Sequence, residues 1–581
     1  INWKAPYGSL VAVNKAGNCQ IVTPDGLRRL RLISKRRIEI KNRKLIRVFD
    51  EISHDASKPD SEQKDDFLFW SLYSRGDPRL QDIVKTIQSE QDEIIRYPAN
   101  TTLVINGVAG SGKSSIALHR VSVLLYPGNS KEPPKSTIVF CPNRVFLEYI
   151  KDLLPSLGDH QVEQMTFNDW ALNFAGLKGY KYVDSAIDVF ISPTTEDRVK
   201  SLRWRRAKLK NTRQMISLLD NHIEQKKLDY EIPDSGWVFQ NIGPLNIDFY
   251  FSKKEINEVI QKVIDDHLPF DQFKKALFIG VNKTSDTKYD KAIWERIQEI
   301  ESQARQKSVE GESEIEEKLV NQARLFQNRA FYIKSNKPNT LNALNVEVAK
   351  KIDALWPKIN VWEEYYQFIG SIDQLKNSSK DMFKRGDVEL LLTDKPQIKT
   401  VEAEDIPAIF YFRQLIDPVI INKYDHVVVD EGQDFSEIQY EIIRSVAKSD
   451  SITITGDIFQ GINAHRGINS WDELNSVFPK NKNLVFKNIN TCYRSTKEIT
   501  EFANAIIKTM DNHPTKLPVP FNRKGEKPRI IKVTTEIDVI NNVISEVKEL
   551  KERKKIENIA VITKNRVECI NIFEHLIKNG I

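Results

Sequence analysis

A glycine-rich segment near residue 107 constrains the fold of this chain more than any other feature. A β-branched run from Thr101 leads into Gly107-Val108-Ala109-Gly110-Ser111-Gly112-Lys113-Ser114-Ser115, and an apolar helical pattern starts at Ile116. The segment fits G-x-x-x-x-G-K-[ST] between a strand and a helix, so it predicts a loop whose backbone N–H groups surround phosphate oxygens. Lys113 is expected to reach the β- and γ-phosphates, and Ser114 to ligate Mg²⁺. The alternative, an ordinary glycine-rich turn, does not account for the full pattern.

The length and the cysteine count limit the class of protein. The chain has 581 residues, too many for one core, and its length suggests about three or four domains. Its four cysteines are scattered without a C-x-x-C pair, which favours a reducing, cytoplasmic location over a disulfide framework or a zinc site. No apolar run is long enough to span a bilayer. A net charge of +6 permits a polyanionic partner without requiring one.

Both ends of the chain predict a piece of a larger protein. The sequence begins with Ile1 and not with Met, and it ends at Ile581 within a helix-to-strand connection. Residues 1–65 predict a β-rich segment with strands at Ser9–Val13, Cys19–Val22, Leu27–Ile40 and Leu45–Phe49. The basic residues from Arg28 to Arg37 are expected to form a solvated strand face, with contact to nucleic acid as the alternative.

An α/β fold with a parallel sheet follows from the alternation of apolar strands and helical patterns. The first part, residues 66–170, holds the phosphate loop and strands near 137–141 and 164–167. The sheet resumes over 406–480, and a last βα part covers 481–581. Between them, residues 171–405 predict a mainly helical insertion shaped as an arm. Its basic stretch Arg203–Lys210 is expected either to face solvent or to bind a nucleic-acid backbone.

Acidic and amide side chains follow the later strands at the positions where a nucleotide needs them. Asp430 ends an apolar strand and is the predicted Mg²⁺ ligand beside Ser114. Glu431 is the predicted base that polarises the attacking water. Gln433 and Gln460 are predicted to position water or to sense the γ-phosphate. Arg494 is the predicted arginine finger, which stabilises charge on the transferring phosphoryl group.

These motifs resemble those of superfamily 1 motor ATPases of the UvrD/Rep/PcrA type. The resemblance rests on Gly107–Ser114, on Asp430-Glu431-Gly432-Gln433-Asp434, on Gly456-Asp457 with Gln460, and on Tyr493-Arg494-Ser495. It implies RecA-like motor domains that bind ATP, with Tyr493 stacked on adenine and Gln91 reading the adenine edge. Gly432 departs from the usual alanine, a loss of one methyl that is expected not to disturb the chemistry.

Segments outside the motor motifs are similar to the HelD family of bacterial RNA polymerase-recycling ATPases. They include Ile1–Leu10, Ile83–Ile95, Ser136–Leu154 and Pro520–Pro528. The resemblance implies that the chain binds RNA polymerase, that residues 171–405 enter its main channel, and that ATP drives its release from nucleic acids. A further arm before Ile1 and the last motor motifs after Ile581 are expected to be missing.

Three hypotheses about function therefore stand. The first is an ATP-hydrolysing factor that releases stalled or post-termination RNA polymerase, with possible direct contact to DNA or RNA. The second is a superfamily 1 DNA helicase or translocase in DNA repair. The third is a polymerase-binding protein in which the nucleotide acts only as a conformational switch. The long insertion favours the first.

Overall fold

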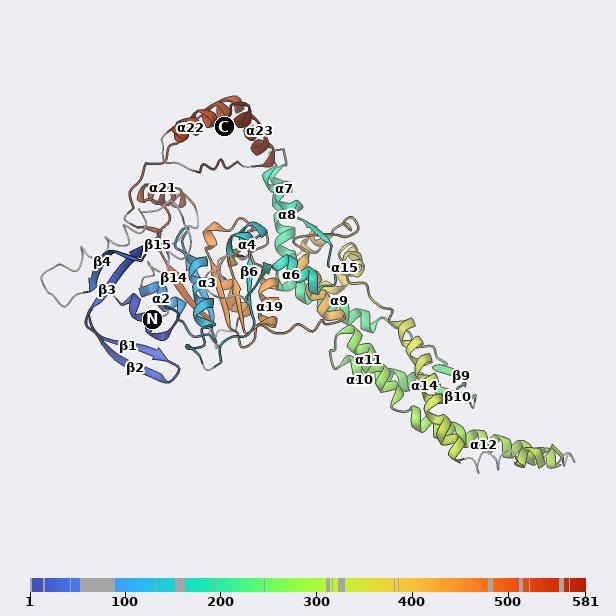
Figure 1. Cartoon of the computed structure of the whole chain (residues 1–581). Helices are drawn as coiled ribbons and strands as arrows, with labels where there is room; N and C mark the ends of the chain where they lie inside the picture. Colours follow the sequence, from blue (N-terminus) through green and yellow to red (C-terminus); the bar gives the residue numbers. More distant parts are fainter. Residues whose placement is uncertain are drawn as a thin grey trace.

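The structure, a computed structural model, describes residues 3–52 and 89–581 apart from short interruptions, of which the longest are 152–161, 310–313, 322–329, 479–483, 511–515 and 553–557. A parallel sheet lies near the centre of the molecule, with two β-hairpins on one side and a long, mainly helical projection on the other (Figure 1). In the part of the chain described, no helix is both long and apolar enough to cross a membrane.

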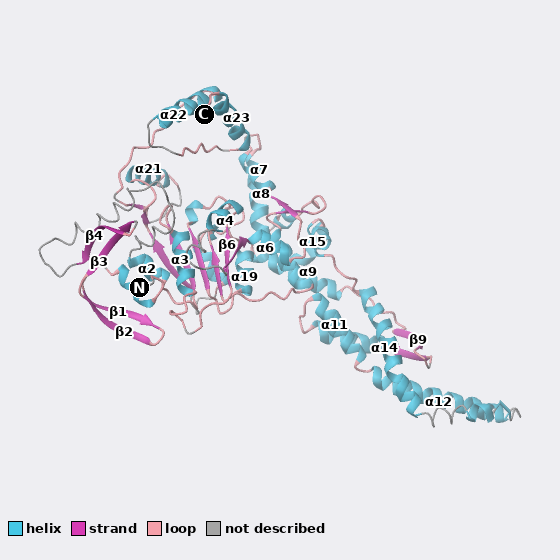
Figure 2. Ribbon diagram, in the orientation of Figure 1, coloured by secondary structure: helices cyan, strands magenta, loops and turns pink. Residues whose placement is uncertain are grey.

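The central sheet has six strands in the order β14-β5-β13-β12-β6-β7, and all neighbours pair in parallel. The strands are β5 (Thr102–Gly107), β6 (Thr137–Cys141), β7 (Val162–Thr166), β12 (His426–Val429), β13 (Ile452–Gly456) and β14 (Leu484–Ile489). Strands β6, β12 and β13 are buried along their whole length, as expected of a sheet covered on both faces. The predicted α/β fold is confirmed (Figure 2).

Helices cover the two faces of the sheet. On one face lie α2 (Ser89–Ile95), α3 (Lys113–Leu124) and α4 (Arg144–Lys151). The other face carries α6 (Phe167–Phe174), α18 (Ile406–Ile416) and α19 (Glu437–Val446). Alternate strand residues divide between them: Val139 packs with α3, whereas Ile138 and Phe140 join the larger core on the opposite face.

Strand β14 lies beyond residue 480, where a boundary between motor domains is predicted. It pairs with β5 along its full length, from Leu484 opposite Thr102 to Ile489 opposite Gly107. The described residues that follow form β15 (Thr491–Cys492), α21 (Lys497–Ile507), β16 (Val519–Pro520), α22 (Glu536–Glu552) and α23 (Arg566–Lys578). Strand β15 pairs only with β16, and no described residue after Phe521 belongs to a strand.

The N-terminal segment is β-rich, as predicted, but its first expected strand is wrong. Pro6–Ala12 form a 3₁₀ helix, η1, because Pro6 fixes the backbone at the first helical position. The described strands form two antiparallel hairpins, β1–β2 (Gly17–Thr23 and Gly26–Leu32) and β3–β4 (Lys35–Lys41 and Lys44–Ile52), so the single strand expected over 27–40 is divided between β2 and β3.

The apolar spacing of the sequence also predicts a helix over 79–97. Its residues 79–88 lie outside the described residues, and α2 covers 89–95.

The insertion leaves the motor through β8 (Lys181–Val183) and returns through β11 (Thr400–Glu402), which pair in parallel. Its helices are α7 (Ser185–Ile191), α8 (Asp197–Lys210), α9 (Arg213–Leu228), α10 (Lys253–Ile264), α11 (Phe270–Asn282), α12 (Ser285–Val309), α14 (Ala330–Leu355), α15 (Val361–Ile369), α16 (Ile372–Ser379) and α17 (Asp387–Leu391). A hairpin of β9 (Trp237–Ile242) and β10 (Ile247–Phe251) is an unpredicted addition to this mainly helical segment.

The distal part of the insertion is an arm that points away from the sheet (Figure 1). Its farthest described helix, α12, has 25 residues and is therefore about 37 Å long. The helical spacing of Ile315, Leu319, Ala323 and Phe326 also predicts a return helix. Residues 314–315 and 317–321 are helical, 322–329 lie outside the described residues, and α14 brings the chain back. One hydrophobic core runs from Ile454 in the sheet through Phe412 to Leu277 and Leu344 in the arm, so the arm is rooted in the motor.

Candidate nucleotide site and the base of the insertion

The predicted phosphate loop connects β5 to α3, and two of its glycines adopt left-handed backbone angles. Gly110 has φ +73° and Gly112 has φ +86°, a region that side chains rarely tolerate. A Cβ on Gly110 would also lie 2.7 Å from Cβ of Arg494. The backbone N–H groups of Tyr493 and Arg494 donate to the Gly110 carbonyl at 3.0 and 3.3 Å. The loop is thus in direct contact with the predicted arginine finger.

Ser114 and Asp430 meet at the ends of α3 and β12, as the sequence predicts. The Ser114 hydroxyl donates to Oδ1 of Asp430 at 2.9 Å, and Thr455 on β13 donates to the same oxygen at 2.5 Å. The other oxygen, Oδ2, is buried and has no partner among the described residues. Burial, and then the charge of Glu431, raises the pKa of Asp430 to about 6. A carboxylate with a free buried oxygen beside a hydroxyl fits Mg²⁺, which prefers oxygen ligands.

Lys113 lies at the centre of this group with its charge unbalanced by any single partner. Its Nζ donates to the Val108 carbonyl at 3.3 Å, and no ion pair to it occurs within the described residues. Burial lowers the pKa of Lys113, while the nearby charges of Glu431, Asp457 and Asp430 act in the opposite direction. A buried ammonium with space for anionic oxygens is suited to a triphosphate.

The predicted base and the two predicted glutamines form one hydrogen-bonded chain. Nε2 of Gln433 donates to Oε2 of Glu431 at 3.0 Å, and the Asp457 backbone donates to Oε1 of Gln433 at 3.0 Å. Gln460 in turn donates to Oδ2 of Asp457. Glu431 has φ +52°, an unfavourable left-handed conformation for a residue with a side chain. The sheet therefore holds all four residues in a defined arrangement beside Lys113.

Gly432 has a role that the sequence reading missed. A Cβ there would lie 2.5 Å from Cγ2 of Ile454 and 2.6 Å from the hydroxyl of Tyr440. Tyr440 occupies this space because its hydroxyl donates to the Gly432 carbonyl at 2.6 Å. In this chain the position has no room for a methyl, while the expectation that its absence leaves the chemistry undisturbed stays a prediction.

Tyr493 and Gln91, the predicted adenine contacts, lie on neighbouring segments. Gln91 is 6% exposed in the first turn of α2. Burial raises the pKa of Tyr493, and the charge of Glu90, which precedes Gln91 on α2, acts in the same direction. The ring of Tyr493 packs on Phe521, with 5.4 Å between ring centroids. The contacts of Tyr493 and Gln91 with adenine stay predictions.

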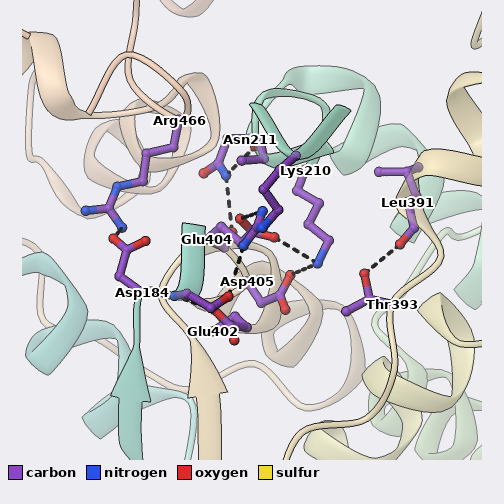
Figure 3. Close-up of polar contacts among 12 residues, drawn as sticks. Asp184, Lys210, Asn211, Leu391, Thr393, Glu402, Glu404, Asp405 and Arg466 are labelled. Carbon is purple, nitrogen blue, oxygen red and sulfur yellow. Dashed lines mark hydrogen bonds and ion pairs between the residues drawn. The ribbon is translucent and has the colours of Figure 1, made fainter. Parts of the chain in front are cut away.

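A network of buried charges fills the base of the insertion, where β8 and β11 meet (Figure 3). Arg203 on α8 donates to Glu404 at 2.5 Å. Nζ of Lys210 lies 3.3 Å from the Glu404 carboxylate and 2.7 Å from that of Asp405. Burial raises the pKa of Glu404, but Lys210 and Arg203 outweigh it, and the pKa lies below its usual value. Two tyrosines, Tyr365 and Tyr366, also donate to Asp405 at 2.9 and 3.3 Å.

These contacts correct the reading of the basic stretch Arg203–Lys210. Neither a solvated face nor a nucleic-acid grip describes it, because Arg203 and Lys210 are buried against carboxylates and Arg205 pairs with Asp387. Lys208 donates to the carbonyl of Gly467, in the loop after β13. The counter-ions lie some two hundred residues away along the chain, so the local sequence gives no sign of them.

The loop after β13 connects the nucleotide site to the insertion. Arg466 forms an ion pair with Asp184 at 2.9 Å (Figure 3). The ring of His465 packs on Phe190 of α7, with 5.1 Å between ring centroids. The same loop begins at Asp457 and includes Gln460. A change in the position of Gln460 can therefore reach the insertion through one continuous loop.

A polar pocket lies beside this loop at the carboxyl ends of β6 and β7. It is lined by Pro142, Asn168, Tyr182, Asn211, Asn463, Arg466 and their neighbours. Asn463 donates to Asp434 at 3.1 Å, which links the pocket to the acidic segment after β12. Amide, guanidinium and aromatic groups of this kind suit the edge and face of a nucleobase.

Comparisons with known proteins agree with this geometry. Residues 87–471 match the profile of the UvrD/REP helicase N-terminal domain, and residues 488–581 match that of the UvrD-like helicase C-terminal domain.

Curated relatives match over a smaller part of the chain. The ATP-dependent DNA helicase PcrA of Leuconostoc citreum is 32% identical over 161 residues, which is 27% of this chain and 21% of that protein. The probable DNA helicase II homolog of Mycoplasma capricolum subsp. capricolum is 28% identical over 205 residues, 33% of this chain and 27% of that protein. PcrA of Staphylococcus aureus is 30% identical over 163 residues, which is 27% of this chain and 22% of that protein. The matched stretches thus span about a quarter of each relative.

Proposed function

Because the chain belongs to the UvrD/REP helicase family, it carries the domain of an ATP-hydrolysing enzyme, and we propose that it uses ATP and Mg²⁺ at the site formed by the phosphate loop and Asp430. The observation that carries this proposal is the convergence of Lys113, Ser114 and Asp430, with a 2.9 Å hydrogen bond between the last two. The buried carboxylate oxygen of Asp430 without a partner is the place for the metal.

The chemistry divides among the residues of the site. Ser114 and Asp430 hold Mg²⁺, which neutralises phosphate charge when bound. Glu431 accepts a proton from the attacking water, while its hydrogen bond from Gln433 fixes the direction of its carboxylate. Gln460 orients groups at the γ-phosphate. Arg494 stabilises the negative charge that develops on the transferring phosphoryl group. Tyr493 and Gln91 hold the base, and the backbone of Gly107–Ser115 surrounds the phosphates.

Within this proposal the chain divides as the sequence predicts. Residues 66–170 and 406–480 form the first motor domain and 481–581 begin the second, although β14 of the latter range pairs with β5 of the first. Residues 171–405 are the insertion that acts on the partner, and 1–65 are an N-terminal β-rich segment.

For the partner, we propose RNA polymerase, which the chain releases from nucleic acids in an ATP-dependent cycle. The support is the arm together with the resemblance of segments outside the motor motifs to the HelD family. An arm rooted in the motor core, with α12 alone about 37 Å long, can reach deep into a channel of a large partner. Its base contacts the loop that carries Gln460, so the nucleotide state can bias the arm.

The second candidate is a DNA helicase or translocase, and the relatives favour it over RNA polymerase. Those relatives are called DNA helicases. The pocket at the ends of β6 and β7, with Asn168, Tyr182 and Arg466, offers groups that suit a nucleobase of a single strand. In this case the arm would guide DNA.

Hydrolysis is tested with two variants that separate binding from chemistry. Lys113→Ala should lose both ATP binding and hydrolysis, because it removes the ammonium from the phosphates. Glu431→Gln should retain ATP binding but lose about 10²- to 10⁴-fold in kcat, the usual contribution of a general base. Equilibrium binding of a fluorescent ATP analogue and steady-state phosphate release measure the two effects. Normal hydrolysis in Glu431→Gln would remove its assigned role.

The partner is tested with the full-length protein. Co-purification with RNA polymerase, ATP-dependent release of polymerase from DNA and weak duplex unwinding are expected. Lys291→Glu on α12 of the arm should weaken polymerase binding more than Lys497→Glu on α21, a matched change outside the arm. Each of these exposed lysines pairs with a glutamate four residues further along its helix. Strong unwinding without polymerase binding would contradict this proposal and support the helicase. DNA affinity that falls steeply with salt would establish phosphate contacts.

A further inference from the structure

Arg120 on α3 is fully buried, yet no carboxylate pairs with it in the described part of the chain. Its partners are all neutral oxygens. Nε donates to the Thr453 hydroxyl at 3.0 Å, and the two Nη atoms donate to the backbone carbonyls of Tyr97 at 2.5 Å and Pro98 at 3.0 Å. Longer bonds reach the carbonyls of Ile94 and Ile95, at 3.3 and 3.4 Å. Burial lowers the pKa of Arg120 to about 9. Such a costly arrangement indicates a specific task.

The carbonyls that Arg120 binds belong to the end of α2 and to the turn that follows it. The last carbonyls of a helix have no partner within the helix, and a cation there interacts favourably with the helix dipole. Arg120 therefore serves as an external cap for α2. Helices in proteins owe most of their stability to tertiary contacts, and the described part of α2 ends at these carbonyls. Its position depends on what holds it.

A second set of hydrogen bonds holds the same turn from the sheet. The Thr453 hydroxyl lies 3.2 Å from Nε2 of His426, Nδ1 of His426 lies 2.8 Å from the Ser451 hydroxyl, and Ser451 donates to the Ala99 carbonyl at 2.6 Å. Burial, and then the charge of Arg120, lowers the pKa of His426 to about 3, so the ring is neutral. Since Ser451 gives its proton to Ala99, Nδ1 donates to Ser451, and Nε2 accepts from Thr453.

The two sets form one path from Arg120 through β13 and β12 to the loop before β5. The end of α2 and its turn, residues 94–99, are thus fixed to α3 and to the start of two strands. Gln91 stands one helical turn before Ile94, so the direction of its amide follows from where α2 is held.

We propose that Arg120 is a positioning residue for the nucleobase: by capping α2 it places the Gln91 amide against adenine and so sets the preference of the enzyme for ATP over GTP. The inference rests on the proposed role of Gln91 as the adenine contact. The amide both donates and accepts, and it matches adenine only in a defined position. At the edge where adenine presents the N6 donor and the N7 acceptor, guanine presents two acceptors, O6 and N7, and cannot match the same amide.

The experiment compares kcat and KM for ATP and GTP in the full-length protein and in Gln91→Ala, Arg120→Gln, Arg120→Lys and Thr453→Val. Arg120→Gln should lower the ATP preference about ten- to a hundredfold, the usual effect of losing a hydrogen bond to a buried group, mainly through a higher KM for ATP. Its kcat should stay within about twofold, since the residues around the γ-phosphate are unchanged. The double variant Gln91→Ala/Arg120→Gln should prefer ATP no less than Arg120→Gln does. Arg120→Lys, which keeps the positive charge, should retain part of the preference for ATP that Arg120→Gln loses.

A matched control tests an exposed contact to the same helix. Lys487 pairs with Glu93 of α2 at 2.7 Å, and Lys487→Ala should leave the ATP preference unchanged. If Gln91→Ala keeps the preference, the assigned role of Gln91 fails and this inference fails with it. If Gln91→Ala loses the preference but Arg120→Gln keeps it, or loses kcat alone, only the inference is overturned. Should Arg120→Gln not fold, Thr453→Val decides: an unchanged preference in that variant overturns the inference, and a lowered one supports it.

Discussion

The nucleotide site and the base of the insertion both bury charged side chains, but they balance them differently. At the base, Lys210 lies between Glu404 and Asp405, and Arg203 also pairs with Glu404. At the nucleotide site, Lys113 has no ion pair among the described residues, and Oδ2 of Asp430 has no partner. The first arrangement is balanced within the protein, whereas the second leaves an ammonium without an ion pair and a carboxylate oxygen without a partner in the described part of the chain, as the proposed binding of a triphosphate and Mg²⁺ would require. A buried charge indicates a ligand site when the protein provides no partner of opposite charge for it. Burial alone does not indicate one.

The pKa values of two buried carboxyl groups express the same difference. Burial raises the pKa of both groups, but at Glu404 the charges of Lys210 and Arg203 reverse the direction. At Asp430 hydrogen bonds from Thr455 and Ser114 offset burial only in part, and the pKa reaches about 6. Among the described residues no ion pair to Asp430 offsets this rise, which agrees with the proposed Mg²⁺ site.

Removal of Arg494 should give the largest loss of activity. It tests most directly whether the unpaired charges of the nucleotide site serve ATP hydrolysis. Arg494→Ala should reduce kcat about 10³- to 10⁵-fold, the range found for arginine fingers, with little loss of fold stability. Steady-state phosphate release and thermal unfolding measure the two quantities. Arg529→Ala is the control, since Arg529 pairs with Glu546 at the surface. A variant of Arg494 that hydrolyses ATP normally would remove the residue from the site.

Removal of Lys210 should produce the opposite result. Lys210→Met leaves Glu404 and Asp405 buried with one cation fewer, which should lower the free energy of unfolding by about 3–5 kcal/mol. The KM for ATP should change little. Lys210→Met with Asp405→Asn should recover part of the stability, because the unpaired charge is gone. Denaturant unfolding checks both variants, and an unchanged stability in Lys210→Met would show that the network contributes nothing.

A smaller effect is expected from added volume beside the catalytic carboxylate. Gly432→Ala pushes against Ile454 and Tyr440 and should cost about 1–3 kcal/mol, typical of an overpacked core. Gly461→Ala is the control, because a Cβ there would find only ordinary contacts, the nearest at 3.5 Å. Equal unfolding free energies for the two variants would contradict the packing described for Gly432.

The smallest effect concerns pH at the contact between the two regions. Burial, and then the charge of Arg466, lowers the pKa of His465 from its ordinary 6.5 to about 4. The charge of Arg203 also lowers this pKa, whereas the charges of Asp184 and Glu404 raise it. Because the unfolded chain takes up a proton before the folded one, stability should fall as pH drops from 6.5 to 4. His465→Phe should reduce the slope of thermal stability against pH in this range, and the remaining slope should come in part from His426, whose pKa is lowered to about 3. An unchanged slope in the variant would assign it to other groups.

The sequence predicted the residues whose neighbours are fixed by strand topology. Asp430 meets Ser114 because β12 and β5 are parallel strands of one sheet, and their carboxyl ends share an edge. Gln460, which follows β13, obeys the same logic, whereas Arg494 follows β15, which lies outside this sheet. Thr455, which donates to Asp430, was within reach of this argument, since it ends the neighbouring strand β13.

The failures have a different physical origin. The basic stretch Arg203–Lys210 was misread because its carboxylates come from β11 and its turn, which only the closure of the insertion brings near. The tight packing at Gly432 depends on Tyr440, one helix further along. The apolar residues of Ser9–Val13 predict a strand, but Pro6 starts a 3₁₀ helix there. The prediction gave too little weight to this proline. Local sequence patterns do not predict side-chain partners that only tertiary contacts bring together.

The parallel pairing of β8 and β11 makes the insertion a cassette with adjoining ends. The backbone N–H of Ala403 donates to the carbonyl of Val183 at 2.8 Å, so a short splice between these two residues would excise everything from Asp184 to Glu402. The splice is not neutral in charge, because Glu404 and Asp405 remain behind without Arg203 and Lys210. A chimaera that receives the insertion must therefore also receive Glu404 and Asp405. In a motor from which the insertion has been deleted, these two residues must be replaced by uncharged ones.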